Sequence, residues 1–261
     1  MRRQSFCGFT LVELLITISV ISILVSMTMP ALARARGIAR SVQCVQNLRQ
    51  LGQGWQMYGD SNDGYCMPQV WFRSNPWIYW WGAYTNPPVY SAGLLYPYVS
   101  AEAGEGGIFE CPEQPWGSYI PQGASRDPTT TYGYNGLCFC PFHSAWDASV
   151  TKANAHWLTL DEIKSSSQVF VFADSLIEWF GSPKNCCLLD GPKVPAGAGW
   201  TENKYPTLCF RHRGSAAVCF ADGHADKVPK DSGHVTWAAG SVGYAGDGLA
   251  PHYVPNWESW F

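Results

Sequence analysis

The architecture of this chain follows from residues 8–29, GFTLVELLITISVISILVSMTM. From Phe9 to Met29 it carries a single charged residue, Glu13, in an otherwise uncharged and largely apolar run. As a helix, a run of this length spans about 30 Å, which is enough to cross the hydrocarbon core of a bilayer. A carboxylate at that depth costs a few kcal/mol at least, and it is usually functional where it occurs. The sequence therefore predicts a membrane helix in which Glu13 is a functional residue.

Two other interpretations of this run compete. Arg2 and Arg3 form a basic start, and Ala31–Ala33 resembles a small-residue cleavage site, as in a secretory signal peptide. However, the run is longer than the apolar core of such peptides, which is about 7–15 residues. A plain membrane anchor explains the length of the run but gives no reason to keep Glu13.

The segment GFTLVELL resembles the processing and methylation signature of type IV pilins and type II secretion pseudopilins. This resemblance implies a leader peptide over residues 1–8, cleavage between Gly8 and Phe9 by prepilin peptidase, and N-methylation of the new amino terminus. It also implies that Glu13 acts in assembly, by pairing with the amino terminus of a neighbouring subunit, and that Pro30 kinks the helix. Such pairing is physically coherent, because a buried carboxylate is tolerated when a cation shares its low-dielectric site.

The helical pattern continues beyond the membrane run. Apolar residues recur three and four positions apart on one face of the predicted helix, namely Val42, Val45, Leu48, Leu51, Trp55 and Tyr58. Gly59 and the polar residues 60–64 end the pattern. We therefore expect a transmembrane half over residues 9–29, an amphipathic half over 30–59 and a globular head over 60–261. A cleaved signal peptide gives no reason for such a continuation.

The head resembles one branch of pseudopilin-like proteins in the order of its segments. The matching segments are QCVQNLRQLGQGWQMYGDSNDGY (43–65), GLLYPYV (93–99), FECPEQ (109–114), TYGYN (131–135), VFADS (171–175) and RHRGSAAVCFADGHADKV (211–228). The last of them carries His212, nine further residues, then Asp222 and Gly223, which is the His-x9-Asp-Gly signature of that branch. With the helical pattern, the resemblance predicts an α+β, pilin-like fold, in which a long N-terminal helix packs on a small antiparallel sheet with long loops.

Taken as residues alone, this signature predicts a β-hairpin. An apolar run at 216–221 suits a buried strand, and residues 225–228 return antiparallel to it. Asp222 and Gly223 would supply a two-residue turn with left-handed backbone angles. His212 and Asp222 then lie at opposite ends of one strand, so they cannot form one catalytic pair.

A metal-dependent enzyme is one alternative for this segment. Its cluster would be His212, Asp222, His224 and Asp226, whereas the structural interpretation assigns Asp222 to the turn and His224 to an exposed strand position. The sequence contains no HExxH, GxSxG or phosphate-loop motif, so we expect no enzyme, no catalytic residue, no metal and no cofactor. A structural calcium ion is a further alternative, because residues 60–64 form an oxygen-rich loop, although it lacks the later glutamate of an EF-hand.

The segment VWFRSNPWIYWWGAY, residues 70–84, concentrates aromatic side chains. Buried, these rings would belong to the core together with the rings of the helix, and this is our expectation. Exposed along a groove, they would favour a membrane-anchored carbohydrate- or protein-binding module.

Overall charge and cysteine usage limit the partners and the compartment. A net charge of -3 and a pI near 6.0 give no reason to expect nucleic acid as a partner. Of the ten cysteines, Cys7 alone precedes the membrane run. If the other side is oxidising, we expect at least one disulfide there, although pairing cannot be read from sequence. Cys44 and Cys111 are candidates, because both lie in segments that resemble the branch.

The leading hypothesis is a membrane-anchored pseudopilin-like subunit of a type II secretion or type IV pilus-like fibre. The resemblance implies prepilin peptidase and other pilin-like subunits as partners. It also implies a single pass through the inner membrane, with the C-terminal head periplasmic or, after assembly, extracellular. Charge alone does not set this orientation, because Arg2 and Arg3 precede the run while Arg34, Arg36 and Arg40 follow it.

Overall fold

A computed structural model of the protein describes residues 10–72, 74–85, 88–101, 106–114, 130–141, 156–179, 181–196, 199–230, 235–246 and 248–254. The cleavage-site residues Gly8 and Phe9 therefore lie outside the described residues. Contacts divide the chain into two compact units, Met1–Ala39 and Arg40–Phe261. Helix α1 (Leu11–Ser61) belongs to both units.

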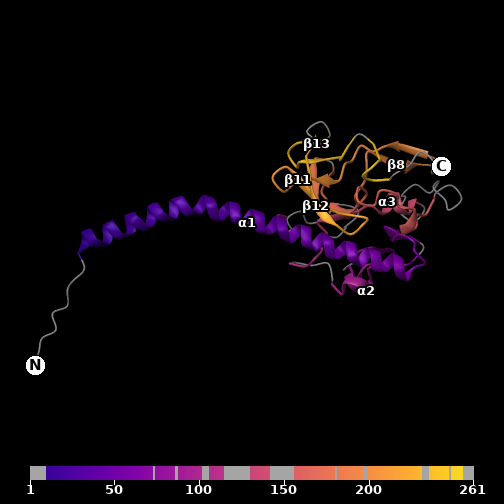
Figure 1. Ribbon diagram of the computed structural model, residues 1–261, viewed down its shortest axis with the longest axis horizontal. Coiled ribbons are helices and arrows are strands. Elements are labelled where there is room, and N and C mark those ends of the chain that lie inside the picture. Colours follow the sequence, from indigo (N-terminus) through magenta and orange to yellow (C-terminus); the bar gives the residue numbers. More distant parts are fainter. Residues whose placement is uncertain are drawn as a thin grey trace, which may run out of the picture. The chain divides into compact units, whose positions relative to one another are not determined.

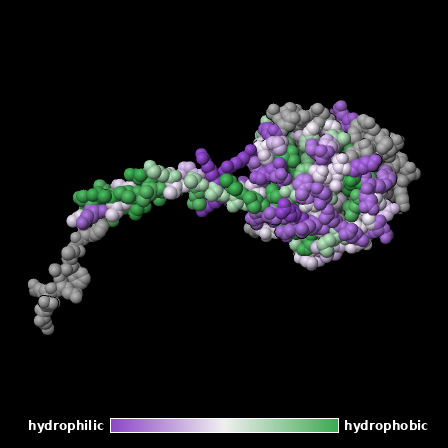
Figure 2. All heavy atoms as spheres, viewed as in Figure 1, coloured by the Kyte–Doolittle hydropathy of each residue, from purple (hydrophilic) through white to green (hydrophobic). Residues whose placement is uncertain are grey.

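In the first unit, α1 presents apolar side chains to the exterior on all sides. Large aliphatic residues are exposed along it from Leu11 to Leu32, and Figure 2 shows this apolar surface in green. Hydroxyl side chains in the same stretch donate to carbonyl oxygens of their own helix, as Ser22 does to Ile18 at 2.7 Å. Because the helix satisfies its own polar groups, it is suited by length and composition to cross a membrane. Pro30 lies inside α1, which continues through it.

The second unit is built on a four-stranded sheet in the order β12-β11-β5-β4, with every neighbouring pair antiparallel. Its strands are β4 (Tyr132–Tyr134), β5 (Phe170–Asp174), β11 (Ser215–Phe220) and β12 (Ala225–Pro229). β5 is buried at every position and β11 at every position but its first, and apart from Asp174 at the end of β5 all of these buried positions are apolar.

The C-terminal part of α1 packs against the middle of this sheet. Leu48, Leu51 and Trp55 share one hydrophobic cluster with Cys219 of β11. Gly52 allows the closest approach, because a Cβ at this position would overlap the Sγ of Cys219. The helix therefore contributes a large part of the core of the second unit, and Figure 1 shows it beside β11 and β12.

Shorter elements surround this core. One small sheet has the order β1-β2-β3 and another the order β10-β14-β13, and two hairpins are formed by β6-β7 and β8-β9. These strands are β1 (Val70–Trp71), β2 (Ile78–Tyr79), β3 (Gly82–Ala83), β6 (Ile177–Trp179), β7 (Ser182–Lys184), β8 (Lys193–Ala196), β9 (Gly199–Glu202), β10 (Leu208–Cys209), β13 (Val235–Trp237) and β14 (Val242–Gly243). The short helices are η1 (Tyr90–Ala92), α2 (Tyr96–Val99), α3 (Gly136–Phe139) and η2 (Leu160–Glu162).

These elements confirm the predicted α+β, pilin-like class, with a long apolar N-terminal helix followed by small antiparallel sheets. The predicted buried face of the helix needs one correction, because Val42 is 51% exposed. At this level of α1 the buried positions are Ser41, Cys44 and Asn47. Because Ser41 and Asn47 are polar, apolar periodicity alone does not identify them as buried, and it predicts Val42 in place of Ser41.

The β11–β12 hairpin is present, but its turn is one residue longer than predicted. The N–H of Phe220 donates to the carbonyl of His224 at 2.9 Å, and the N–H of Gly223 donates to the carbonyl of Phe220 at 2.9 Å. The loop therefore consists of Ala221, Asp222 and Gly223, and of these only Gly223 has a left-handed φ, 89°. This is the three-residue hairpin loop, a type I turn followed by a left-handed glycine.

Candidate functional site

Glu13, the charged residue of the membrane run, caps its own helix. Its Oε2 accepts hydrogen bonds from the N–H and the hydroxyl of Thr10, each at 2.8 Å. In return, the N–H of Glu13 donates to the Thr10 hydroxyl at 3.2 Å. This reciprocal arrangement is a capping box, with Thr10 as N-cap and Glu13 at the third helical position. The carboxylate thus has an intramolecular role, and its pairing with a neighbouring subunit stays a prediction.

His212 and Asp222 lie at opposite ends of β11, as the sequence predicts. His212 closes the turn before the strand, because its N–H donates to the Ser215 carbonyl at 2.9 Å and its carbonyl accepts in return from the Ser215 N–H at 3.2 Å. Between them, Arg213 and Gly214 both have left-handed φ angles, 55° and 84°. Such a pair is typical of the two-residue hairpin turn with left-handed central residues.

Both ends of this signature are connected to α1, the first of them through a disulfide. At the first end, His212 Nε2 lies 3.5 Å from the Sγ of Cys111, which forms a disulfide with Cys44 of α1. At the other end, the amide of Gln56, also in α1, donates to the carbonyl of Ala221 at 3.2 Å. The signature therefore holds β11 along the helix at two points.

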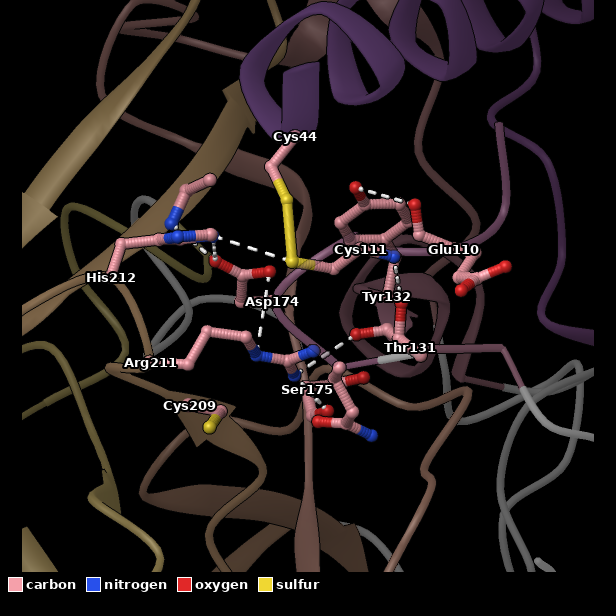
Figure 3. A network of polar contacts seen from close by, with 12 residues as sticks. Cys44, Glu110, Cys111, Thr131, Tyr132, Asp174, Ser175, Cys209, Arg211 and His212 are labelled. Carbon is pink, nitrogen blue, oxygen red and sulfur yellow. Dashed lines mark hydrogen bonds and ion pairs between the residues drawn. A yellow bond between two sulfur atoms is a disulfide. The ribbon is translucent and has the colours of Figure 1, made fainter. Parts of the chain in front are cut away.

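A buried cluster surrounds His212 and is drawn in Figure 3. The Nε2 of His212 lies 3.0 Å from Oδ2 of Asp174, the last residue of β5. The same Oδ2 accepts the N–H of Ala217 in β11 at 2.7 Å. Cys44 and Cys111 form a disulfide with their Cα atoms 5.3 Å apart, and they are the pair offered as candidates from the sequence. We call Cys44, Cys111, Asp174 and His212 the His212 cluster.

Arg211 supplies the positive charge beside this cluster. Its Nε lies 3.6 Å from Oδ1 of Asp174, and a terminal nitrogen donates to the carbonyls of Thr131, at 3.1 Å, and Ser175. Burial acts to lower the pKa of Arg211, but Cys209 and then Asp174 oppose it, and the pKa is raised overall. The guanidinium therefore stays charged, and the hydrogen bonds to carbonyls compensate part of the cost of burying it.

The His212 cluster shares its composition, but not its geometry, with a Cys–His–Asp catalytic triad. Nε2 of His212 faces both the Cys111 sulfur and the Asp174 carboxylate, whereas a triad histidine uses a different ring nitrogen for each partner. Nδ1 of His212 has no hydrogen-bond partner within the described part of the chain. All four side chains are buried. This arrangement suits a structural cross-link or a bound cation, and it offers no nucleophile to a substrate.

Within the described residues, the His212 cluster is also the one group of three or more potential metal ligands that come together, with ligand atoms within 4.8 Å of one another. The alternative cluster of His212 with Asp222, His224 and Asp226 is not formed, and Asp222 lies in the turn with His224 exposed, as the structural interpretation expected. Asp222 pairs instead with His224 across the turn, since Nδ1 of His224 contacts Oδ1 of Asp222. The physical reason is the length of β11, which separates the two ends of the signature.

The oxygen-rich loop at 60–64 closes the end of α1. The amide of Asn62 donates to the carbonyl of Tyr58 at 2.7 Å and to the hydroxyl of Tyr98 at 3.3 Å. Asp63 and Gly64 then turn the chain with left-handed φ angles of 54° and 81°. Calcium binding by this loop stays a prediction.

The aromatic segment 70–84 belongs largely to the core. Tyr79, Trp80 and Trp81 are buried, as expected, and the indole N–H of Trp80 donates to the carbonyl of Cys187 at 3.0 Å. Trp77 is 40% exposed. Because the central rings of the segment are buried, the structure does not favour the carbohydrate- or protein-binding alternative.

Two members of the buried network, Asp174 and Arg211, were not predicted from the sequence. A signal for each was present. Asp174 ends the apolar strand sequence VFVFAD, where a carboxylate needs a partner if the strand is buried, and Arg211 directly precedes His212. The sequence does not show that these two segments are neighbours, because they are brought together only by the antiparallel pairing of β5 with β11.

Comparison with known proteins supports one class. Residues 3–29 match the family model described as the prokaryotic N-terminal methylation motif. Together with the apolar part of α1, this match supports a type IV pilin-like protein that is anchored in a membrane, and it implies processing by prepilin peptidase and assembly with other pilin subunits. Neither a curated protein nor a solved structure matches the chain.

Proposed function

We propose that the protein is a pseudopilin-like subunit of a type II secretion or type IV pilus-like fibre. The observation that carries this proposal is the methylation motif at residues 3–29, which includes most of the exposed apolar part of α1. On this proposal, prepilin peptidase cuts between Gly8 and Phe9, and Phe9 is then N-methylated. α1 crosses the inner membrane once, and the head lies in the periplasm or, after assembly, outside the cell.

The subunit would act mechanically. The apolar side chains of α1 between Leu11 and Leu32 are exposed, so they require lipid before assembly and neighbouring helices after it. The Cys44–Cys111 disulfide ties the same helix to the head, and buried contacts such as Gly52 on Cys219 add to the attachment. A force on the helix is therefore transmitted to the head without a catalytic residue.

Mass spectrometry of the mature amino terminus tests this proposal. We expect N-methylated Phe9 as the first residue in cells with prepilin peptidase, and the full-length precursor in cells without it. Gly8→Leu should leave the precursor in the membrane, because glycine alone fits a tight protease site without a side chain. Cys7→Ala, one residue earlier, is the matched control and should be processed. A mature chain that starts at Arg34 would instead identify a cleaved signal peptide.

A further inference from the structure

The His212 cluster combines ligand types that metals of intermediate softness prefer. It offers two cysteine sulfurs, one histidine nitrogen and one carboxylate oxygen, all within 4.8 Å of one another and all buried. Four separate segments supply them: Cys44 from α1, Cys111 from the chain after Phe109, Asp174 from the end of β5 and His212 from the turn before β11. The fold therefore brings together ligands from four segments that are distant from one another in the sequence.

We propose that, when the Cys44–Cys111 disulfide is reduced, the four side chains of the His212 cluster bind one zinc ion. Structural zinc is almost always four-coordinate and tetrahedral, with cysteine, histidine and carboxylate ligands. Zn–S bonds of about 2.3 Å in a tetrahedron place two sulfurs about 3.8 Å apart. Cα atoms 5.3 Å apart accommodate that separation once the bond between the sulfurs is broken.

The orientation of the side chains fits a central ion. Nε2 of His212 lies 3.5 Å from the Cys111 sulfur and 3.0 Å from Oδ2 of Asp174, so the ring nitrogen and the carboxylate oxygen face the same place. On metal binding, the proton that Nε2 now donates to the carboxylate would move to Nδ1 of the same ring, and Nε2 would then offer its lone pair to the ion. The Ala217 N–H, 2.7 Å from Oδ2 of Asp174, would keep the carboxylate in place as an outer-shell partner. No ligand has to be brought from elsewhere in the chain.

The charges also balance. Two thiolates and a carboxylate exceed the charge of Zn²⁺ by one negative charge, and a neutral imidazole adds none. Arg211, with Nε 3.6 Å from Oδ1 of Asp174, supplies the remaining positive charge. Because an uncompensated buried charge is costly, this neutral set suits the interior of the head.

The conversion between the two states conserves atoms and electrons. A dithiol reductant transfers two electrons and two protons to the sulfurs, the S–S bond breaks, and the reductant becomes its own disulfide. Zn²⁺ then replaces the two thiol protons, which pass to solvent, and its oxidation state does not change. The reduced head keeps α1 cross-linked to the sheet by zinc, and the oxidised head keeps it cross-linked to Cys111 by the disulfide.

Zinc content of the full-length chain in detergent tests this proposal. One sample is kept oxidised and one is reduced with a phosphine, which takes up an oxygen from water and leaves no competing thiol. Both are incubated with zinc, separated from unbound metal by gel filtration, and analysed for zinc by mass spectrometry. We expect about one zinc per reduced chain and none above background in the oxidised chain. No zinc in the reduced chain, or equal amounts in both samples, overturns the proposal.

X-ray absorption identifies the ligands in the wild-type chain. We expect two sulfur neighbours at about 2.3 Å and two nitrogen or oxygen neighbours at about 2.0–2.2 Å. Four sulfur neighbours would assign the ion to other cysteines and overturn the proposal.

Variants then assign the site to individual residues. Asp174→Asn and His212→Gln should each weaken zinc binding by the reduced chain more than about tenfold, while the oxidised chain keeps its disulfide. Cys66→Ala removes a buried thiol outside the cluster and should bind zinc as the wild type does. Unchanged affinity in both ligand variants contradicts the proposal. If a variant fails to fold, judged by the near-UV circular dichroism of its oxidised form, the wild-type zinc content and ligand set decide.

Discussion

At the scale of single residues, the head depends on a few polar side chains that lie where the strands are otherwise apolar. Asp174 is the clearest case, because one buried carboxylate contacts the N–H of Ala217, the imidazole of His212 and the guanidinium of Arg211. Removing such a carboxylate leaves the opposite charge buried without compensation.

Asp174→Asn should therefore destabilise the full-length chain by about 3 kcal/mol. The amide oxygen can still accept the N–H of Ala217, so the predicted loss comes from the charge opposite Arg211. Asp222→Asn is the matched control, since Asp222 lies in the exposed turn and asparagine suits turns, and it should cost less than about 1 kcal/mol. Chemical unfolding in detergent, followed by tryptophan fluorescence, measures both. Equal losses would show that the charge of Asp174 is unimportant.

Asp190 gives the head a pH dependence of its own. Burial raises the pKa of Asp190 from 3.8 to about 7. Between about pH 4 and pH 7, Asp190 is therefore protonated in the folded chain and ionised in the unfolded chain. The free energy of unfolding falls as the pH rises through this window and levels off above it.

Asp190→Asn should remove that fall, which is on the order of 4 kcal/mol, and stabilise the chain at pH 8 relative to the wild type. At pH 4 the two should be nearly equal, because Asp190 is protonated in the folded wild type. Asp161→Asn, at an exposed position of η2, should follow the wild-type profile. A wild-type profile that is flat between pH 4 and pH 7, or identical to that of Asp190→Asn, contradicts the raised pKa.

At the scale of elements, the contact between α1 and β11 is tight at one glycine. Gly52→Ala gains helix propensity, about 1 kcal/mol, but its new Cβ would overlap the Sγ of Cys219. We expect a net destabilisation of about 1–3 kcal/mol, the usual cost of overpacking.

Removing the obstructing atom should rescue the variant. Cys219→Ala deletes the Sγ, and the Cβ of residue 219 lies 3.8 Å from the place that the new Cβ of residue 52 would take, an ordinary contact. In a double-mutant cycle, Gly52→Ala should therefore cost less in the Cys219→Ala background than in the wild type. Additive effects would place the cost of Gly52→Ala elsewhere.

Some of these elements could be predicted from the sequence and others could not. α1 could be predicted almost to its ends, because an apolar run and then an apolar face of helical period extend over fifty positions or so. The β11–β12 hairpin followed from an apolar run and Asp222-Gly223. The strands β13 and β14 were not predicted, since strands of two or three residues leave too short a pattern to recognise.

At the scale of the whole molecule, the same limit applies to the site. His212 could be singled out from its signature, but its partners come from α1, β5 and the segment around Cys111, and no local pattern specifies that these meet. For Glu13, only the role in assembly was predicted, although a glutamate three residues after a threonine also suits a capping box.

Two variants separate those roles. Glu13→Gln keeps an oxygen that can accept from Thr10, since glutamine also completes a capping box, but it removes the charge. Thr10→Val removes the hydroxyl that bonds Oε2 and accepts the N–H of Glu13, but it keeps the carboxylate. If the carboxylate receives the amino terminus of a neighbouring subunit, Glu13→Gln should be processed and inserted normally yet fail to form fibres, because the amine would remain buried and uncompensated. Thr10→Val should cost about 1 kcal/mol of helix stability and still assemble.

Cross-linking of fibres in cells that make only one variant, beside a membrane-fraction blot, measures assembly and insertion separately. Normal fibres from Glu13→Gln and defective ones from Thr10→Val would show that Glu13 serves its own helix and not the assembly.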